Sequence, residues 1–250
     1  MTDNAMRPEV KFFNDTSISY RKEYNLQTPD GYSFRVRREK VLAMVPENSK
    51  VLDIACGPGV MIPGFRSKHC LITCTDAAPE MIARIKDEYG DAPDFTAVVG
   101  DAYALPFESY SYDVATVMGL IEYLEDQGKF LGEANRVLKQ DGTLIITFPN
   151  YTSPWRAANR ILVAFKRLLN KKSSGKVTHR EYTAKGATAL LEQHRFNVEE
   201  ILYYNFKLIP YPLDRKLPRF TVMQSRIFEH LDRGPFKWLG TAFIVRATKR

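Results

Sequence analysis

The chain has 250 residues, 44% of them hydrophobic, so it can bury the core of a single α/β domain, and its net charge of +7 favours an anionic partner. Three cysteines, with no CxxC and no Cys/His cluster, exclude a disulfide framework and predict no metal site. The sequence has no recognisable signal peptide, and none of its apolar runs approaches the roughly 18 residues needed to cross a bilayer. We therefore expect a cytoplasmic protein.

The order of the predicted elements is that of an α/β fold. Residues 1–45 are predicted to form helices ahead of the sheet, with SISYRKEY and SFRVRREKVLAMV as the periodic pieces. From residue 51 onward, β-rich runs alternate with helical patterns, which predicts a doubly wound, mostly parallel sheet. Seven runs are predicted to be strands: 51–55, 71–76, 94–100, 112–118, 142–148, 198–206 and 241–248. Crossover helices are predicted over 79–89, 127–140 and 183–194, the second ending at an Asp-Gly stop.

The elements predict one domain over residues 1–250, made of four parts. Residues 1–45 form a helical cap, and 46–149 form a cofactor-binding core. Residues 150–180 form a basic helical insertion, and the remaining 181–250 include a loop-rich stretch over 207–238 on the substrate side. Ligands of open α/β sheets bind beyond the carboxyl ends of the strands, so we expect the parts outside the core to select the substrate.

Two glycines follow the first predicted strand in the run VLDIACGPGV, at residues 51–60. Gly57 and Gly59 would let a nucleotide-like ligand approach the backbone at a helix N-terminus. The dinucleotide fingerprint G-x-G-x-x-G is not matched, because Gly64 comes too late to take the helix-packing position. No Gly-Lys-Ser/Thr follows, which disfavours a P-loop.

Four linked motifs carry a resemblance to a known family. DIACGPG begins at residue 53, Thr-Asp ends the second strand, Gly-Asp-Ala at 100–102 is followed by LPF, and YDVATVMGLIEYLED spans 112–126. In this order they resemble the class I S-adenosylmethionine-dependent methyltransferases, strongly over residues 45–149 and loosely beyond. The resemblance implies a Rossmann-like methyltransferase fold with S-adenosyl-L-methionine as cofactor.

The resemblance also implies roles for individual residues. Asp76 would accept hydrogen bonds from the ribose hydroxyls, and Asp101 would hold the exocyclic amine of adenine. Asp53 would hold the amino group of the methionine end, which lies against Gly57 and Gly59. Arg21 would pair with the methionine carboxylate or, as the alternative, remain solvated. The other residues expected at the cofactor are Tyr20, Tyr24, Ala55, Ala77, Ala102 and Met118.

Methyl transfer needs an aligned nucleophile more than acid-base groups, and positioning supplies roughly 7–11 kcal/mol of the barrier. For a hydroxyl acceptor, the candidate bases are Glu122, Tyr123 and His179, none with a recognisable partner in the sequence. The family commonly has a histidine where this chain has Tyr123, which weakens the case for an imidazole base at that position.

The insertion indicates an amphipathic helix. Seven basic residues lie from Arg156 to Lys176, with no acid among them. Apolar side chains recur at helical spacing in the same stretch, at Trp155, Ala158, Leu162, Phe165 and Leu169. Residues 155–176 could contact an anionic membrane at about 1 kcal/mol per basic residue, or form a lid over the pocket, and the two roles are compatible.

The sequence thus predicts a methyltransferase acting on an oxygen or nitrogen of a small or amphipathic acceptor, lipid-linked molecules included. The alternative is a cofactor-binding regulator or scaffold without turnover. An RNA methyltransferase ranks third, because MGLIEYL stands after the fourth strand where adenine-amino enzymes carry an Asp- or Asn-Pro-Pro-aromatic run, and nucleic acid is disfavoured as a partner. The sequence does not indicate an oligomeric state.

Overall fold

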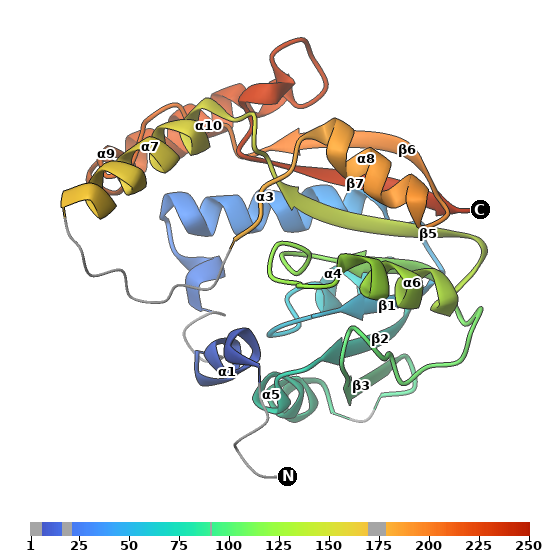
Figure 1. The fold of residues 1–250 in the computed structure, drawn as a ribbon. Helices are drawn as coiled ribbons and strands as arrows, with labels where there is room; N and C mark the ends of the chain where they lie inside the picture. Colours follow the sequence, from blue (N-terminus) through green and yellow to red (C-terminus); the bar gives the residue numbers. More distant parts are fainter. Residues whose placement is uncertain (1–6, 17–21, 91, 170–178) are drawn as a thin grey trace.

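The computed structural model of the chain describes residues 7–16, 22–90, 92–169 and 179–250. Seven strands form one sheet in the order β3-β2-β1-β4-β5-β7-β6 (Figure 1). β7 runs antiparallel to β5 and β6, and the other neighbours are parallel, which confirms the doubly wound, mostly parallel fold. The strands are β1 Lys50–Ile54, β2 Leu71–Asp76, β3 Phe95–Val99, β4 Tyr112–Val117, β5 Leu138–Pro149, β6 Phe196–Tyr204 and β7 Ala242–Lys249.

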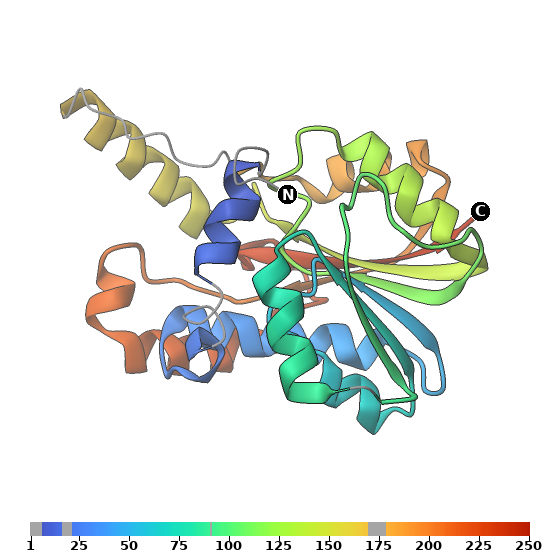
Figure 2. The ribbon, with the colours of Figure 1, turned by 90° about the horizontal axis from the view of Figure 1, so that it is seen from below.

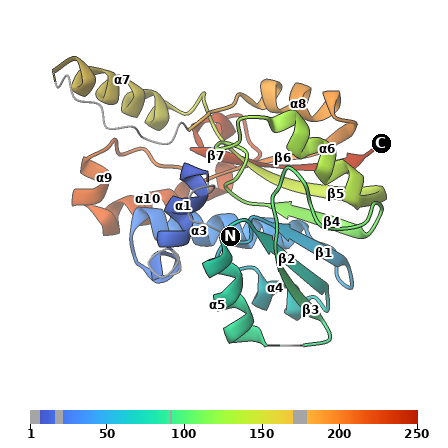
Figure 3. The ribbon, with the colours of Figure 1, turned by 60° about the horizontal axis from the view of Figure 1, so that its bottom comes forward.

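Helices cover both faces of the sheet (Figure 3). On one face lie α3 (Pro29–Met44), α4 (Ile62–Ser67) and α5 (Pro79–Tyr89), whose buried side chains share one hydrophobic cluster with β1 and β2. On the other lie α6 (Gln127–Val137) and α8 (Ala184–Gln193), which pack with β4 and β5 in a second cluster. The two clusters make a three-layer core that fixes the carboxyl ends of the strands in place.

Polar residues mark where several of these helices begin. Thr28, Asp126 and Thr183 precede α3, α6 and α8, and each side chain accepts a hydrogen bond from a backbone N–H of the first turn. Such caps stabilise a helix by about 1 kcal/mol. Proline occupies the first turn of α3 and α5, where the backbone N–H that it lacks would have no partner within the helix.

Four helices lie outside the layers. α1 (Pro8–Asp15) lies against α5, where Asn14 Oδ1 accepts a hydrogen bond from the N–H of Glu80 at 3.1 Å. α7 (Pro154–Leu169) projects away from the sheet (Figures 2 and 3), whereas α10 (Pro218–Phe228), which follows α9 (Leu213–Lys216), packs against α3. Two short 3-10 helices, Glu229–Leu231 and Lys237–Leu239, follow α10. Among the described residues, no helix is both long and apolar enough to span a bilayer.

The largest departures from the predicted boundaries of the strands and crossover helices lie next to the Asp-Gly pair at 141–142. α6 ends at Val137, not at the Asp-Gly pair, and β5 begins at Leu138. Asp141 takes a φ of 60°, and a Cβ on Gly142 would lie 2.8 Å from the carbonyl oxygen of Lys139, so the pair bends the strand instead of stopping the helix.

The stretch 207–238 is not simply loop-rich, because it contains α9 and α10. Pro218 occupies the first turn of α10, where a proline is compatible with a helix.

Gly64 has the packing role that the sequence argued against. A Cβ at this position in α4 would lie 2.3 Å from Cδ1 of Leu42 in α3. The glycine therefore allows the two helices to meet closely, although it comes later than in a dinucleotide fingerprint.

Candidate functional site

The first cavity lies at the carboxyl ends of β1, β2, β3 and β4. The strand order reverses between β1 and β4, and such a reversal is where open α/β sheets bind their ligands. Six residues predicted at the cofactor line this cavity: Ala55, Gly57, Asp76, Ala77, Ala102 and Met118.

Asp76 is the charged group in the floor of this first cavity. One carboxylate oxygen accepts a hydrogen bond from the N–H of Gly57 and the other from the N–H of Ala78, both at 2.9 Å. Burial raises the pKa of Asp76, and these backbone hydrogen bonds act in the opposite direction. Each oxygen keeps a further acceptor site, so the carboxylate can also bind a pair of hydroxyls.

The two glycines of the turn have different roles. Gly57, with a φ of 52°, lines the first cavity and so lets a ligand approach its backbone. Gly59 does not line the cavity; a Cβ there would lie 2.7 Å from Cδ1 of Ile62 and 3.1 Å from Cγ1 of Ile85. A side chain at position 59 is therefore disfavoured by the packing of α4 and α5, whereas Gly57 is the glycine of this turn that lines the cavity.

Asp53 lies beneath the turn, in β1, and is 1% exposed. Its Oδ1 accepts a hydrogen bond from Thr116 Oγ1 at 2.7 Å, whereas Oδ2 is buried without a hydrogen-bond partner among the described residues. Burial raises the pKa of Asp53 to about 7, although the Thr116 hydrogen bond opposes this change. A buried carboxylate in this state is suited to a cationic ligand nearby.

Asp101 is placed differently from the prediction. Its carboxylate pairs with the Arg7 guanidinium at 2.8 Å and accepts a hydrogen bond from the N–H of Tyr103, and it does not line the first cavity. Gly100 and Ala102 line the cavity in its place. Arg7 also stacks on the Tyr103 ring at 4.7 Å, so the Arg7–Asp101 pair closes the outer edge of the site.

The N-terminal segment contributes α1 to the wall of the first cavity. Arg7, Val10 and Phe13 line the cavity, and no motif in the sequence marks these three residues. Tyr24 is buried elsewhere, where its hydroxyl accepts a hydrogen bond from Arg37 at 2.9 Å. Tyr20 and Arg21 lie outside the described residues.

A second cavity adjoins the first, and Phe13, Gly119 and Tyr123 line both. Its remaining wall comes from α3, β5, the start of α7 and the strands β6 and β7. The charged side chains in this wall are Arg37, Glu122, Arg156 and His179. A polar compartment thus lies directly beside the predicted cofactor cavity.

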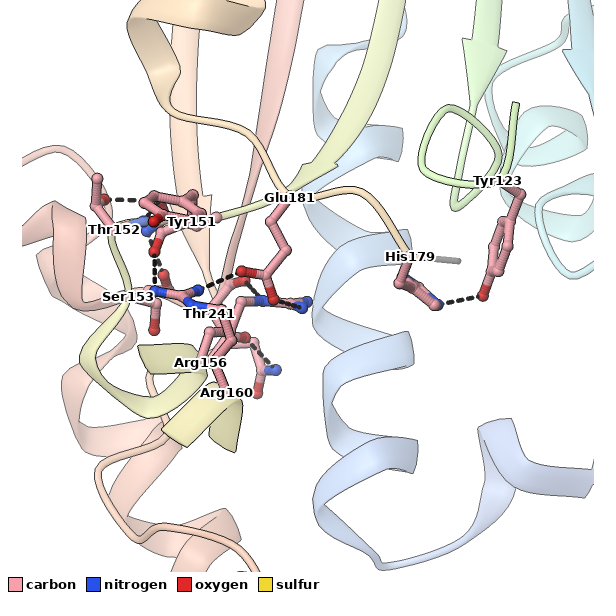
Figure 4. A network of polar contacts seen from close by, with 12 residues as sticks. Tyr123, Tyr151, Thr152, Ser153, Arg156, Arg160, His179, Glu181 and Thr241 are labelled. Carbon is pink, nitrogen blue, oxygen red and sulfur yellow. Dashed lines mark hydrogen bonds and ion pairs between the residues drawn. The ribbon is translucent and has the colours of Figure 1, made fainter. Parts of the chain in front are cut away.

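All three predicted catalytic residues lie in the second cavity, and two of them are partners, contrary to the sequence expectation. The Tyr123 hydroxyl and His179 Nε2 lie 2.7 Å apart (Figure 4). Loss of hydration raises the pKa of Tyr123, whereas loss of hydration and the nearby Arg156 lower the pKa of His179. Near neutral pH the phenol is therefore protonated and the imidazole is free to accept a proton.

Glu122 is the third of these residues. It is 7% exposed, and burial raises the pKa of its carboxyl group. Its Oε2 is buried without a hydrogen-bond partner among the described residues. The raised pKa makes the Glu122 carboxylate a stronger base than an ordinary glutamate side chain.

A network of arginines fixes the base of α7 beside the second cavity (Figure 4). Glu181 pairs with Arg156 at 3.1 Å and also with Arg160. Arg156 donates a further hydrogen bond to the carbonyl oxygen of Thr241 at 2.6 Å. Two of the basic residues in the insertion are therefore engaged inside the protein and are not simply displayed on its surface.

Gly119 joins the two cavities and tolerates no side chain. Its φ is 71°, and a Cβ would lie 2.9 Å from Nη1 of Arg37. We expect Gly119→Ala to lower the free energy of unfolding by about 1–3 kcal/mol, measured by urea denaturation. The matched control is Gly132→Ala in α6, where a Cβ meets nothing within 4 Å. The control should gain about 0.5–1 kcal/mol, and equal stability of the two variants would contradict the strain at Gly119.

The fold and the first cavity define a Rossmann-like α/β protein of the methyltransferase class. Residues 52–146 match a family described as a methyltransferase domain. An uncharacterized protein of Methanocaldococcus jannaschii is 31% identical over 172 residues, which are 67% of this chain and 63% of that protein. The chain belongs to the class I S-adenosylmethionine-dependent methyltransferases, whose cofactor is S-adenosylmethionine.

Two further proteins are similar to parts or all of the chain. A demethylmenaquinone methyltransferase of Thermotoga maritima is 36% identical over 110 residues, covering 43% of this chain and 46% of that enzyme. A putative methyltransferase of Haloferax volcanii, solved with the Trm112 methyltransferase activator, has a TM-score of 0.65 at 18% identity, over 98% of this chain and 99% of that one. The chain spans 63% and 46% of the two curated relatives named here.

The first cavity fits this cofactor. The Asp76 carboxylate in the floor of the cavity and the Asp53 carboxyl group buried beneath the turn suit a ligand with a sulfonium and an ammonium group. Ile54, Ala102 and Met118 supply an apolar wall for a flat ring.

Proposed function

We propose that the chain transfers a methyl group from S-adenosylmethionine to an oxygen or nitrogen of a small or amphipathic acceptor held in the second cavity. One observation carries the proposal: Phe13, Gly119 and Tyr123 line both cavities, so a molecule in one adjoins a molecule in the other. The cofactor supplies an activated methyl group, and the side chains need to bind, align and deprotonate the acceptor. The name of the demethylmenaquinone relative supports a small-molecule acceptor.

In this proposal the pair Tyr123 and His179 takes the proton that an acceptor hydroxyl loses. Tyr123 lines both cavities, and its hydroxyl lies 2.7 Å from Nε2 of His179, which lines the second cavity. A neutral imidazole accepts the proton that passes through the phenol. Glu122 is the alternative base, since its buried carboxyl group faces the same compartment.

The cofactor roles of Asp53 and Asp76 are also proposals. Asp76 would bind the ribose hydroxyls, which its position in the floor of the first cavity supports. We expect Asp76→Ala to weaken S-adenosylmethionine binding at least tenfold in a calorimetric titration, because a charge-assisted hydrogen bond contributes about 1.5–3 kcal/mol. Unchanged affinity in a folded variant would rule out the ribose assignment.

The transfer itself is tested with tritiated S-adenosylmethionine and a fractionated cell extract, counted separately in lipid, RNA, protein and small-molecule pools. Label in the small-molecule or lipid pool, absent with Asp76→Ala, is the expected result. Label in RNA would favour the third interpretation. Cofactor binding without label in any pool would favour a regulator or scaffold.

We propose, in addition, that the arm formed by α7 contacts an anionic membrane. Ile161 is 72% exposed and Phe165 is 58% exposed, and both project from a helix that leaves the body of the protein (Figure 2). Exposed apolar side chains beside basic residues favour anionic lipid. Because Glu181 pairs with Arg156 and Arg160, these two arginines contribute less to electrostatic attraction between α7 and an anionic membrane. The same ion pairs support a lid role for the first turns of α7.

A flotation experiment separates the two roles of α7. We expect the protein to float with phosphatidylglycerol vesicles but not with phosphatidylcholine vesicles, and the double substitution Ile161→Ser with Phe165→Ser to reduce this strongly. Both side chains are exposed, so the variant should fold normally. Equal flotation of the variant and the parent protein would leave only the lid role.

A further inference from the structure

The helix α10 is the reverse of an ordinary surface helix. Its buried residues are Thr221, Gln224 and Ser225, whereas Phe220 is 53% exposed and Ile227 is 57% exposed. A surface helix of a globular protein normally buries its apolar stripe and displays its polar face. In α10 the buried side chains are polar, and large apolar side chains are exposed instead.

Hydrogen bonds fix α10 in this orientation. Gln224 Oε1 accepts a hydrogen bond from the N–H of Leu208 at 3.0 Å, and Gln224 Nε2 donates to the carbonyl oxygen of Phe206 at 2.7 Å. The helix also packs against α3. Turning α10 to bury Phe220 and Ile227 would break both bonds of Gln224, so the exposed apolar side chains belong to the folded state.

The exposed apolar side chains continue along the whole arm at helical spacing. We call this face the α10 stripe, and it consists of Leu213, Leu217, Phe220, Met223 and Ile227. These residues follow one another at intervals of three or four positions, which places them along one side of a helix. Apolar side chains gathered in this way mark an interaction site, whereas single exposed ones do not.

The charged side chains that adjoin the α10 stripe are positive. The exposed charged residues of the stretch 213–227 are Arg215, Lys216, Arg219 and Arg226. Arg215 also pairs with Asp30 at 3.7 Å. The acid of this stretch is Asp214, which is buried. The surface of residues 213–227 therefore joins large apolar side chains to cations without an exposed acid.

This combination of groups discriminates between kinds of partner. Nucleic acid would bind the cations, but its charged backbone would leave the apolar stripe without a match. A second copy of the chain would bring its own cations to the same patch, because a two-fold contact is self-complementary. An anionic bilayer presents negative phosphates above an apolar interior, and so it matches both the cations and the stripe.

We propose that the α10 stripe docks on the surface of an anionic bilayer, with its apolar side chains in the headgroup region and the neighbouring cations on lipid phosphates. This contact follows from α9 and α10 and does not depend on the contact proposed for α7. Leu208, which Gln224 holds, lies three residues after Asn205 in the wall of the second cavity. A docked α10 keeps that cavity near the bilayer, which suits an amphipathic acceptor; this consequence rests on the proposed function.

A reporter within the stripe tests the proposal. Met223→Cys is labelled with acrylodan, whose emission moves to shorter wavelength in apolar surroundings, and the native Cys56, Cys70 and Cys74 are buried. At an ionic strength of about 0.15 M, we expect this shift with phosphatidylglycerol vesicles and not with phosphatidylcholine vesicles. No shift with either, or an equal shift with both, would overturn the proposal. A shift produced by RNA but not by vesicles, or by raising the protein concentration alone, would overturn it in favour of nucleic acid or a second copy.

Flotation of a second variant tests the stripe without a label. Phe220→Ser with Ile227→Ser should reduce flotation with phosphatidylglycerol vesicles by about tenfold or more, because it removes apolar area from the contact. The matched control is Leu71→Ser with Val99→Ser, which removes similarly exposed side chains from β2 and β3 and should float like the parent protein. Unchanged flotation of the α10 variant, or an equal loss in the control, would contradict the docking role. Titration with S-adenosylhomocysteine checks that each variant is folded, and failure of the parent protein to bind it would remove the proposed function but not the docking result.

Discussion

Replacing Tyr123 with phenylalanine is expected to lower the rate of methyl transfer by 10² or more, within the range of about 10²–10⁴ that a positioned proton-transfer group contributes. The substitution removes only the hydroxyl, which lies 2.7 Å from His179, and keeps the ring that meets Phe13 edge-on at 5.5 Å. The rate is measured as tritium transfer from S-adenosylmethionine into the extract pool that accepts label.

Three further variants make this prediction specific. His179→Gln should lower the rate to a similar degree, because it removes the group that receives the proton. Tyr110→Phe is the matched control, since Tyr110 is 62% exposed and lines neither cavity. If Tyr123→Phe stays within about threefold of the parent rate while Glu122→Gln falls by 10² or more, Glu122 is the base and the Tyr123 pair is not.

Replacing Asp53 with asparagine is expected to stabilise the protein at alkaline pH, by on the order of 2–4 kcal/mol, and to change little at acid pH. The pKa of Asp53 is about 7 in the folded chain, against an ordinary value of 3.8. Between these values the folded state holds a proton that the unfolded state has lost. The free energy of unfolding that Asp53 contributes therefore falls as the pH rises through this window, and the deficit is complete above it.

Urea denaturation of both proteins at about pH 3 and about pH 8.5 measures this effect, since the two conditions lie on either side of the window. Asparagine has nearly the shape of the protonated acid and can still accept the hydrogen bond from Thr116. An advantage of Asp53→Asn that is the same at both pH values would contradict the raised pKa. A stable variant that also binds S-adenosylmethionine less tightly would indicate that the buried carboxylate serves the ligand at the expense of stability.

The sequence predicted those features that depend on local patterns. Gly57, Asp76, Ala77 and Ala102 follow strands that their own β-rich runs define, so their arrival at one cavity follows from parallel pairing. Boundaries were predicted less well where a local signal has two meanings. The Asp-Gly pair at 141 was taken as the end of a helix and is a bend inside β5.

Contacts between distant segments could not be predicted. Tyr123 and His179 are separated by 56 residues, and Arg7 meets Asp101 across 94. Nothing in the local sequence of either partner marks the other, because these pairs depend on the tertiary placement of α1 and of the described residues that begin at His179. Gly59 shows that a local motif can also be interpreted too readily. Its position is typical of ligand binding, but the space that a side chain would need there is filled by Ile62 and Ile85.

The most direct measurement is a calorimetric titration of the purified protein with S-adenosylmethionine, S-adenosylhomocysteine and NADH. Binding of one equivalent of each sulfur compound, with no heat from NADH and no competition by it, is the expected result. Absence of heat from both sulfur compounds, or their displacement by NADH, would contradict the assignment of the first cavity.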